Sequence, residues 1–167
     1  NKHFKNPADL FIKPDHYVFR MMFSQGISLQ SLGIEELNKE SHEKNSRKIW
    51  KLFAKNYYLF RGTPTRIWLD DVFENLFKLD VPLNADNANF YYEKINSLLK
   101  TDDFLPRNLF KKLNIEVLST TEDPLDDLEA HKKIIESKSG LNIISTYRPD
   151  NVINPEIKNF INNIIRF

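Results

Sequence analysis

The segment IEVLSTTEDPLDDLEAHKKIIESKSGLNIISTYRPD, residues 115–150, decides the fold class of this chain. Residues 115–119 form a short run rich in branched apolar side chains, and residues 141–145 form a similar run one helix length later. Runs of this length between turn residues are typical of buried parallel strands. Because a crossover between parallel strands is almost always right-handed, the order strand, helix, strand predicts an α/β unit whose helix packs on the sheet.

The stretch between the two predicted strands indicates how the helix begins. Asp123 is expected to cap it, and Pro124 suits its first position. Gly140 closes the unit, and a further helix is predicted to start at Pro155. In the helix between the two strands, residues at intervals of three and four predict one inward face. These residues are Leu125, Leu128, His131, Ile134 and Ile135. We interpret His131 as a packing histidine.

The N-terminal part of the chain predicts helices only. Asn6 and Asp15 each precede a helical pattern as an N-cap residue does. The change from this pattern to alternating strand and helix predicts a helical region over 1–105 and a βαβα region over 106–167. Apolar residues at helical spacing predict the later helices around 42–60, 65–78 and 90–99, with a short one from Pro106.

Composition excludes several classes of protein. The 24 basic and 23 acidic residues give a net charge of +1, so no electrostatic field of the protein favours binding to nucleic acid or to an anionic membrane. The absence of cysteine excludes disulfides and thiolate chemistry. The apolar runs are too short to span a bilayer and no signal-peptide pattern opens the chain, so a cytoplasmic location is expected. Four glycines are too few and too scattered for a phosphate-binding loop.

The group Asp15-His16-Tyr17 with Arg20 is the first candidate site. It lies on the first turn of a predicted helix, where free backbone N–H groups favour an anionic ligand. A neutral imidazole there can exchange hydrogen bonds, and the phenol of Tyr17 can transfer a proton. The alternative is an ordinary capped helix start, which is the commoner origin of such a triplet.

The ends of the predicted strands carry the second candidate site. Arg148 follows the second strand, and its guanidinium is suited to a carboxylate. The alternative is a surface ion pair between Arg148 and Asp150. Thr121 and Asp123 follow the first strand and are candidates for ligand binding, although Asp123 also suits helix capping. No H-x-H, H-E-x-x-H or acidic calcium loop occurs, so no metal ligands are assigned to this chain.

Four segments, in this order, resemble uronate isomerase (glucuronate isomerase), a divergent branch of the amidohydrolase superfamily. Residues 4–27 are similar to the stretch around its D-H-Y-x-x-R-x-M motif, and residues 82–96 to its L-N-x-D-T-A-x-x-x-W-E segment. Residues 104–134 resemble its stretch with T-T-D-D-P-x-D-S-L-E-Y-H, and residues 145–150 its S-W-R-P-D. The departures replace family Asp, Ser, Tyr and Trp by Glu122, Asp127, Ala130 and Tyr147.

The resemblance implies an enzyme that interconverts aldo- and keto-hexuronates, such as glucuronate and fructuronate, by moving a proton between C2 and C1. It implies His16 and Tyr17 as catalytic residues. Arg148 is implied as a substrate-binding residue, and Arg20, Thr121 and Asp123 are our candidates for the same role. The family fold is a (β/α)₈ barrel with a divalent metal, usually zinc, and a homo-oligomer is expected.

A full barrel takes about 250 residues and eight strands, whereas this chain predicts two strands. The family's metal-binding H-x-H precedes D-H-Y, and its metal-binding Asp lies on a late strand. We therefore expect a partial barrel carrying the second and third βα units, a fragment that binds no catalytic metal and is inactive alone. Two alternatives remain: a non-catalytic helical domain that binds a protein partner, and a different barrel enzyme of the same superfamily.

Overall fold

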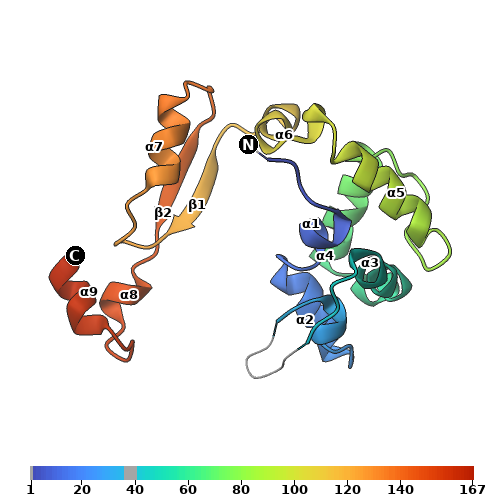
Figure 1. Ribbon diagram of the computed structural model, residues 1–167, viewed down its shortest axis with the longest axis horizontal. Coiled ribbons are helices and arrows are strands. Elements are labelled where there is room, and N and C mark those ends of the chain that lie inside the picture. Colours follow the sequence, from blue (N-terminus) through green and yellow to red (C-terminus); the bar gives the residue numbers. More distant parts are fainter. Residues whose placement is uncertain (1, 36–40) are drawn as a thin grey trace. The chain divides into compact units, whose positions relative to one another are not determined.

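The computed structural model describes residues 2–35 and 41–167. The chain forms two compact units, Asn1–Asn108 and Leu109–Phe167. The first unit is helical, and the second contains the strands (Figure 1). The chain is therefore a helix-rich α/β protein.

Short helices and helical turns build the first unit. The α-helices up to residue 112 are α1 (Pro7–Phe11), α2 (His16–Ser24), α3 (Ser46–Lys55), α4 (Pro64–Asp71), α5 (Ala88–Leu98) and α6 (Pro106–Lys112). Between them lie the 3₁₀ turns η1 (Gln30–Leu32), η2 (Tyr57–Phe60) and η4 (Asp102–Phe104). A π-helical turn, η3 (Val72–Leu76), follows α4 directly.

The predicted caps of the first two helices are confirmed. Asn6 Oδ1 accepts a hydrogen bond from Asp9 N at 3.0 Å, and Asp15 caps α2 in the same way. The prediction of one regular helix over 65–78 is wrong in one respect, because its second half is a π turn. There Phe77 N donates to Val72 O at 3.2 Å, and this bond widens the helix by one residue. The helix predicted around 42–60 likewise divides into α3 and η2.

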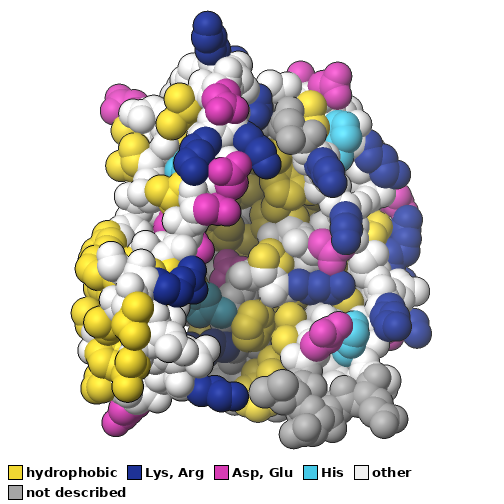
Figure 2. Space-filling view, turned by 60° about the vertical axis from the view of Figure 1, so that its left-hand side comes forward, with side chains coloured by type: hydrophobic (Ala, Val, Ile, Leu, Met, Phe, Trp, Pro, Cys, Tyr) yellow, Lys and Arg dark blue, Asp and Glu magenta, His cyan; other side chains and the backbone are white. Residues whose placement is uncertain are grey.

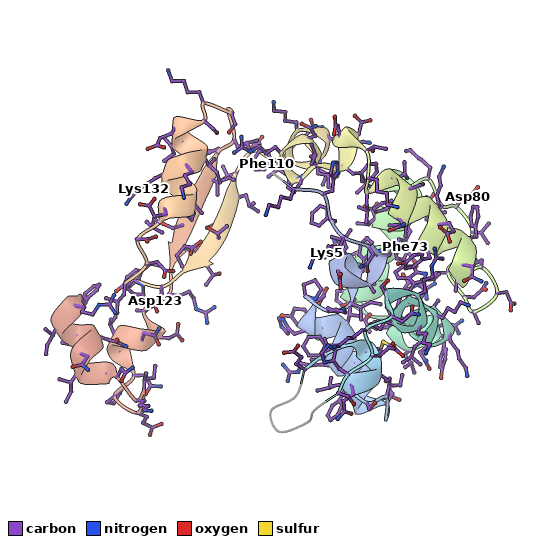
Figure 3. The ribbon with its side chains drawn as sticks, viewed as in Figure 1. Lys5, Phe73, Asp80, Phe110, Asp123 and Lys132 are labelled. Carbon is purple, nitrogen blue, oxygen red and sulfur yellow. The ribbon has the colours of Figure 1, made fainter. Side chains whose placement is uncertain are left out.

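Aromatic rings fill the core of the first unit. The ring of Phe73 lies between α1, α3 and α5 (Figure 3), with its centroid 5.4 Å from those of Phe11 and Tyr91. The indole of Trp50 lies 6.2 Å away and donates from Nε1 to Ala88 O at 2.9 Å. These rings are almost completely buried. The heavy aromatic content of the sequence is thus used mainly in packing.

The second unit contains the predicted strand, helix, strand order. Strands β1 (Leu118–Glu122) and β2 (Ile143–Tyr147) pair in parallel, with Leu118 opposite Ile143 and Glu122 opposite Tyr147. Helix α7 (Glu129–Glu136) connects them. Two further helices, α8 (Asp150–Ile153) and α9 (Phe160–Arg166), follow β2. The parallel pairing is confirmed.

The predicted positions of the strands are wrong by two or three residues. The first was expected at 115–119 and the second at 141–145, but both lie nearer the C-terminus. The reason is that Thr120, Thr121 and Tyr147, taken as loop residues, have side chains that favour strands and extend the pairing. Thr121 is therefore part of β1 and does not follow it.

The predicted helix starts in this unit are also wrong. Asp123 does not cap α7, because its Oδ1 accepts from Leu125 N at 2.8 Å and forms a tight turn instead. Leu128, with φ of 55°, precedes the helix, and Asp127 Oδ1 accepts from Glu129 N. After β2, α8 was not foreseen, and the last helix begins at Phe160 rather than Pro155.

The two strands are not buried as expected. Most side chains of β1 and β2 are exposed, because α7 is the helix that packs on them in the described part of the chain. Exposed apolar side chains also gather over α8 and α9, visible as yellow atoms at the lower left of Figure 2: Ile153, Ile161, Ile164, Ile165 and Phe167. Among the described residues of the second unit, the buried apolar side chains are those of Phe110 and Val152.

Within residues 2–35 and 41–167, no helix has both the length and the apolarity needed to span a membrane.

Candidate active site

The Asp-His-Tyr motif forms the start of α2 and lies at the surface of the first unit. Asp15 Oδ1 accepts hydrogen bonds from Tyr17 N at 2.9 Å and Val18 N at 3.3 Å. This cap holds His16 and Tyr17 in the first turn, with their ring centroids 4.2 Å apart. Both side chains are exposed, Tyr17 by 68%. Neither ring hydrogen-bonds to another described residue, so both are available to a ligand.

Arg20 belongs to the same side of α2. It lies four residues after His16 and three after Tyr17, and residues at these spacings are neighbours on a helix. Its side chain is exposed and makes no ion pair within the described residues. The helix therefore presents an imidazole, a phenol and a guanidinium together, a set that can exchange protons and attract an anion.

A pocket of about 680 Å³ opens beside this motif, within the first unit. Its walls come from the start of α2, from η2 and from the first two turns of α4. A volume in this range is ordinary for a small-molecule site. Most of its wall is apolar or aromatic, with hydroxyl and carboxylate groups among the lining residues: Asp15, Tyr17, Met21, Phe60, Thr63, Pro64, Thr65 and Trp68.

A partly buried polar network connects η2 and α4, two of the elements that line this pocket. Tyr57 Oη donates to Asp70 Oδ1 at 2.9 Å, and Arg66 Nε donates to Asp70 Oδ2 at 2.6 Å. The Arg66 guanidinium also lies 4.0 Å above the ring of Tyr57. Burial raises the pKa of the Tyr57 phenol well above its ordinary value, and the neighbouring Asp70 carboxylate adds to this. The network joins η2 to α4.

Sequence reasoning missed both the pocket and this network. The spacing of Arg66 and Asp70, four residues apart, was a signal for an ion pair. No pattern within α4 alone could show that Trp68 and Tyr17 line the same pocket, because their contact surfaces come from different helices.

The carboxyl ends of the strands hold the second group of candidates. Thr121 is exposed near the end of β1, opposite Thr146 of β2. Arg148 comes directly after β2, and its backbone N donates to Glu122 O at 3.2 Å, which extends the ladder by one bond. The structure therefore brings Thr121 and Arg148 to the same edge of the sheet.

The side chains of Asp123 and Arg148 already have protein partners. Asp123 accepts from Leu125 N and from the side-chain amide of Asn151. Arg148 Nε donates to Asp150 Oδ2 at 3.1 Å, and both of these side chains are more than half exposed. This hydrogen bond lowers the pKa of the Asp150 carboxyl. The ion pair considered as an alternative for Arg148 is thus present.

His131 contacts β1 from α7. Its Nε2 lies 2.9 Å from Thr120 Oγ1 and 3.8 Å from Glu122 Oε1, and its side chain is 13% exposed. The interpretation of His131 as a packing histidine is confirmed. It joins the helix to the strand through polar contacts.

No group of three or more His, Cys, Asp or Glu side chains is placed to hold a metal ion within the described ranges, 2–35 and 41–167. These residues therefore do not fit the divalent metal that the resemblance implies. The Asp-His-Tyr group belongs to one compact unit and Arg148 to the other.

Comparison with known proteins shows the family. The model of the glucuronate isomerase family matches residues 1–167. The chain belongs to the glucuronate isomerase family. Among curated members, the uronate isomerase of Mesorhizobium japonicum is 48% identical over 166 residues, which cover 99% of this chain and 35% of that protein. The uronate isomerase of Sphingopyxis alaskensis is 46% identical over 168 residues and is covered to the same extent, 35%.

Solved structures of the glucuronate isomerase family agree with the fold. The crystal structure of glucuronate isomerase from Caulobacter crescentus matches with a TM-score of 0.90 and 42% identity, over 99% of this chain and 34% of that one. The uronate isomerase of Thermotoga maritima matches with a TM-score of 0.84 and 25% identity, over 99% and 35%. The chain thus spans about a third of the length of the relatives it matches.

Proposed function

We propose that this chain supplies part of the substrate site of a uronate isomerase, which interconverts D-glucuronate with D-fructuronate and D-galacturonate with D-tagaturonate. The observation that carries the proposal is the family match over residues 1–167 together with the exposed Asp-His-Tyr group at the start of α2. The relatives are about three times as long, so the complete reaction requires more polypeptide than these residues.

In this proposal Tyr17 and His16 act on the hydroxyl and carbonyl groups at C1 and C2. Conversion of aldose to ketose removes the proton from C2, forms an enediol and returns a proton to C1. The carbonyl oxygen on C1 gains a proton and the hydroxyl on C2 loses one. A phenol beside an imidazole, both exposed and 4.2 Å apart, is suited to exchange these oxygen-bound protons.

Arg148 is proposed to bind the carboxylate of the hexuronate. Asp150 Oδ2 accepts from Nε of its guanidinium, and this bond orients the group, while the terminal nitrogens have no partner among the described residues and suit a two-point contact. Arg20 and Thr121 are proposed to bind substrate as well, because both are exposed and have no side-chain partner in the described part of the chain. Asp123 is proposed for the same set, although a substrate hydroxyl would share its oxygens with Leu125 and Asn151.

The larger assembly follows from the same resemblance. We propose that β1 and β2 are the second and third strands of a (β/α)₈ barrel, preceded by a helical insertion over 1–105, and that the protein is a cytoplasmic homo-oligomer. The divalent metal, with zinc as the first choice, is proposed to bind residues of the family outside this chain. It would polarise substrate oxygens as a Lewis acid.

Product analysis tests the proposal. The full-length polypeptide that carries this segment, supplied with Zn²⁺, is incubated with D-glucuronate or D-galacturonate and the products are separated and identified by NMR. We expect D-fructuronate and D-tagaturonate, and a Tyr17→Phe variant of unchanged circular dichroism should lose activity by at least about a hundredfold. If neither sugar yields a ketose, the proposed function is overturned. Turnover by the 167-residue chain alone would contradict the proposed location of the metal ligands.

A further inference from the structure

The pocket beside the Asp-His-Tyr motif carries one group that the proposed reaction does not use, the indole of Trp68. Trp68 lines the pocket from α4 and is 49% exposed, whereas the other tryptophan, Trp50, is completely buried in the core. A half-exposed indole next to an exposed phenol is an unusual use of two large aromatic side chains, because burial of both would stabilise the fold.

The orientation of Trp68 is fixed by its neighbours on α4. Arg66 and Asp70 face η2 and are held there by Tyr57. Trp68 lies two residues from each of them, which turns it by about 200° around the helix axis. The network holds one side of α4 against η2, and Trp68 lines the pocket from the other side of the same helix.

We propose that Trp68 is a substrate-contacting residue that stacks on the C–H face of the hexuronate at its C1–C2 end. The proposal rests on the proposed function. Sugar C–H groups are apolar and slightly positive, and they suit the negative face of an indole. The ring of Tyr17 provides a second aromatic wall, and the Thr65 hydroxyl, without a hydrogen-bond partner among the described residues, provides a polar contact.

Electrostatics decides which end of the sugar enters. Asp15 belongs to the pocket lining, and its carboxylate repels the carboxylate of a hexuronate. The carboxylate on C6 is at the opposite end of the molecule from C1 and C2. The sugar therefore enters with its reacting end toward Tyr17 and Trp68 and keeps its carboxylate at the mouth of the pocket.

NMR on the 167-residue chain tests this contact with internal controls. D-glucuronate is titrated while the two indole N–H signals and the two methionine methyl signals are followed. Trp68 and Met21 line the pocket, whereas Trp50 and Met22 are buried elsewhere in the same unit. We expect saturable shifts for the first pair and none for the second. D-glucose, which lacks the carboxylate, should shift the same signals.

Substitutions then isolate the indole. Trp68→Leu should weaken the titration of the Met21 methyl about threefold to tenfold, the loss expected for one ring-face contact, and Trp68→Phe should restore most of it. Ile67→Ala removes an apolar side chain that is 73% exposed on the same helix but outside the pocket lining, and it should have no effect. The proposal is overturned if Trp68→Leu binds D-glucuronate as tightly as the parent chain does. It is also overturned if benzoate shifts the signals of the pocket residues and D-glucuronate does not.

Kinetics separates this proposal from the function on which it rests. In the full-length polypeptide, Trp68→Leu should raise KM for glucuronate with a smaller change in kcat, because stacking acts on bound substrate and transition state alike. An active isomerase with unchanged KM in Trp68→Leu refutes the stacking role and leaves the function intact. A polypeptide that isomerises no hexuronate refutes the function, whatever the pocket binds.

Discussion

Asn151 donates its side-chain amide to Asp123, and this hydrogen bond joins the start of α8 to the turn after β1. Arg148 lies between the two elements, with its backbone N bonded to Glu122 O. The backbone that carries the guanidinium proposed to bind a carboxylate is thus bonded to the end of β1, and the helix after it is bonded to the turn that follows β1. The Arg148 backbone is fixed even though its side chain is exposed.

Replacing Asn151 should loosen Arg148. Asn151→Ala leaves the Asp123 carboxylate without this partner, at a cost of about 1–2 kcal/mol in the free energy of unfolding of the second unit. Hydrogen exchange of the Arg148 amide should become faster as a result. Asn162→Ala is the matched control, because Asn162 is an exposed residue of α9. Equal exchange rates in both variants would show that the bond does not anchor the loop.

The Tyr57 hydroxyl should stabilise the first unit. Tyr57→Phe removes the donor to Asp70 while keeping the ring, so we expect a loss of about 1–2 kcal/mol in urea denaturation followed by tryptophan fluorescence. The neighbouring Tyr58 is 64% exposed, and Tyr58→Phe should change the free energy by less than about 0.5 kcal/mol. The idea fails if the two variants unfold at the same urea concentration.

Asp15 should be needed to hold the motif in place. Asp15→Ala removes the acceptor for Tyr17 N and Val18 N and should cost about 1 kcal/mol. Asp15→Asn keeps a side-chain oxygen at the cap and should restore most of this stability. Thermal unfolding of the three proteins measures the difference. A melting temperature in Asp15→Ala equal to that of the parent argues that the cap contributes nothing.

The first unit should lose stability in alkali. Burial raises the pKa of Tyr91 from its ordinary 10.0 to about 12, with the carboxylates of Asp70 and Asp80 adding to the shift. Between these two values the unfolded chain releases the phenol proton and the folded chain keeps it, so stability is complete below pH 10 and falls as pH rises toward 12. The pKa of Tyr57 is raised in the same direction and adds to the loss.

A Tyr91→Phe variant should reduce this alkaline slope without removing it, because Tyr57 remains. The measurement is urea denaturation at a series of pH values across that interval. Identical slopes in the variant and the parent would show that Tyr91 titrates alike in the folded and unfolded chains.

Local chemistry made some of the fold predictable and tertiary contact decided the rest. The caps at Asn6 and Asp15 follow from short side-chain oxygens next to a helical pattern, and both are present. Asp123 followed the same rule and failed, because a turn to Leu125 and a bond to Asn151 compete for its oxygens. Its true role depends on a residue that lies on another element.

The candidate site divides in the same way. His16 and Tyr17 could be placed on an exposed helix start from the sequence, because the cap fixes the first turn. The ion pair of Arg148 with Asp150 was foreseen as an alternative, since only Pro149 separates the two residues in the sequence. Trp68 was assigned to a helix by its spacing, but its exposure depends on how α4 packs against η2.

The π turn at Val72–Leu76 decides which changes in length this part of the chain can absorb. It contains one residue more than an α-helical path would use, and the rings of Phe73, within the turn, and Phe77, directly after it, both contact Phe11. Loss of a single residue at the exposed Glu74 or Asn75 would remove this surplus and restore ordinary helical winding, so Phe77 would stay on the core side. Loss of one residue from the regular turns of α4 has no surplus to remove; it would rotate every later side chain by about 100° and carry Phe77 away from Phe11.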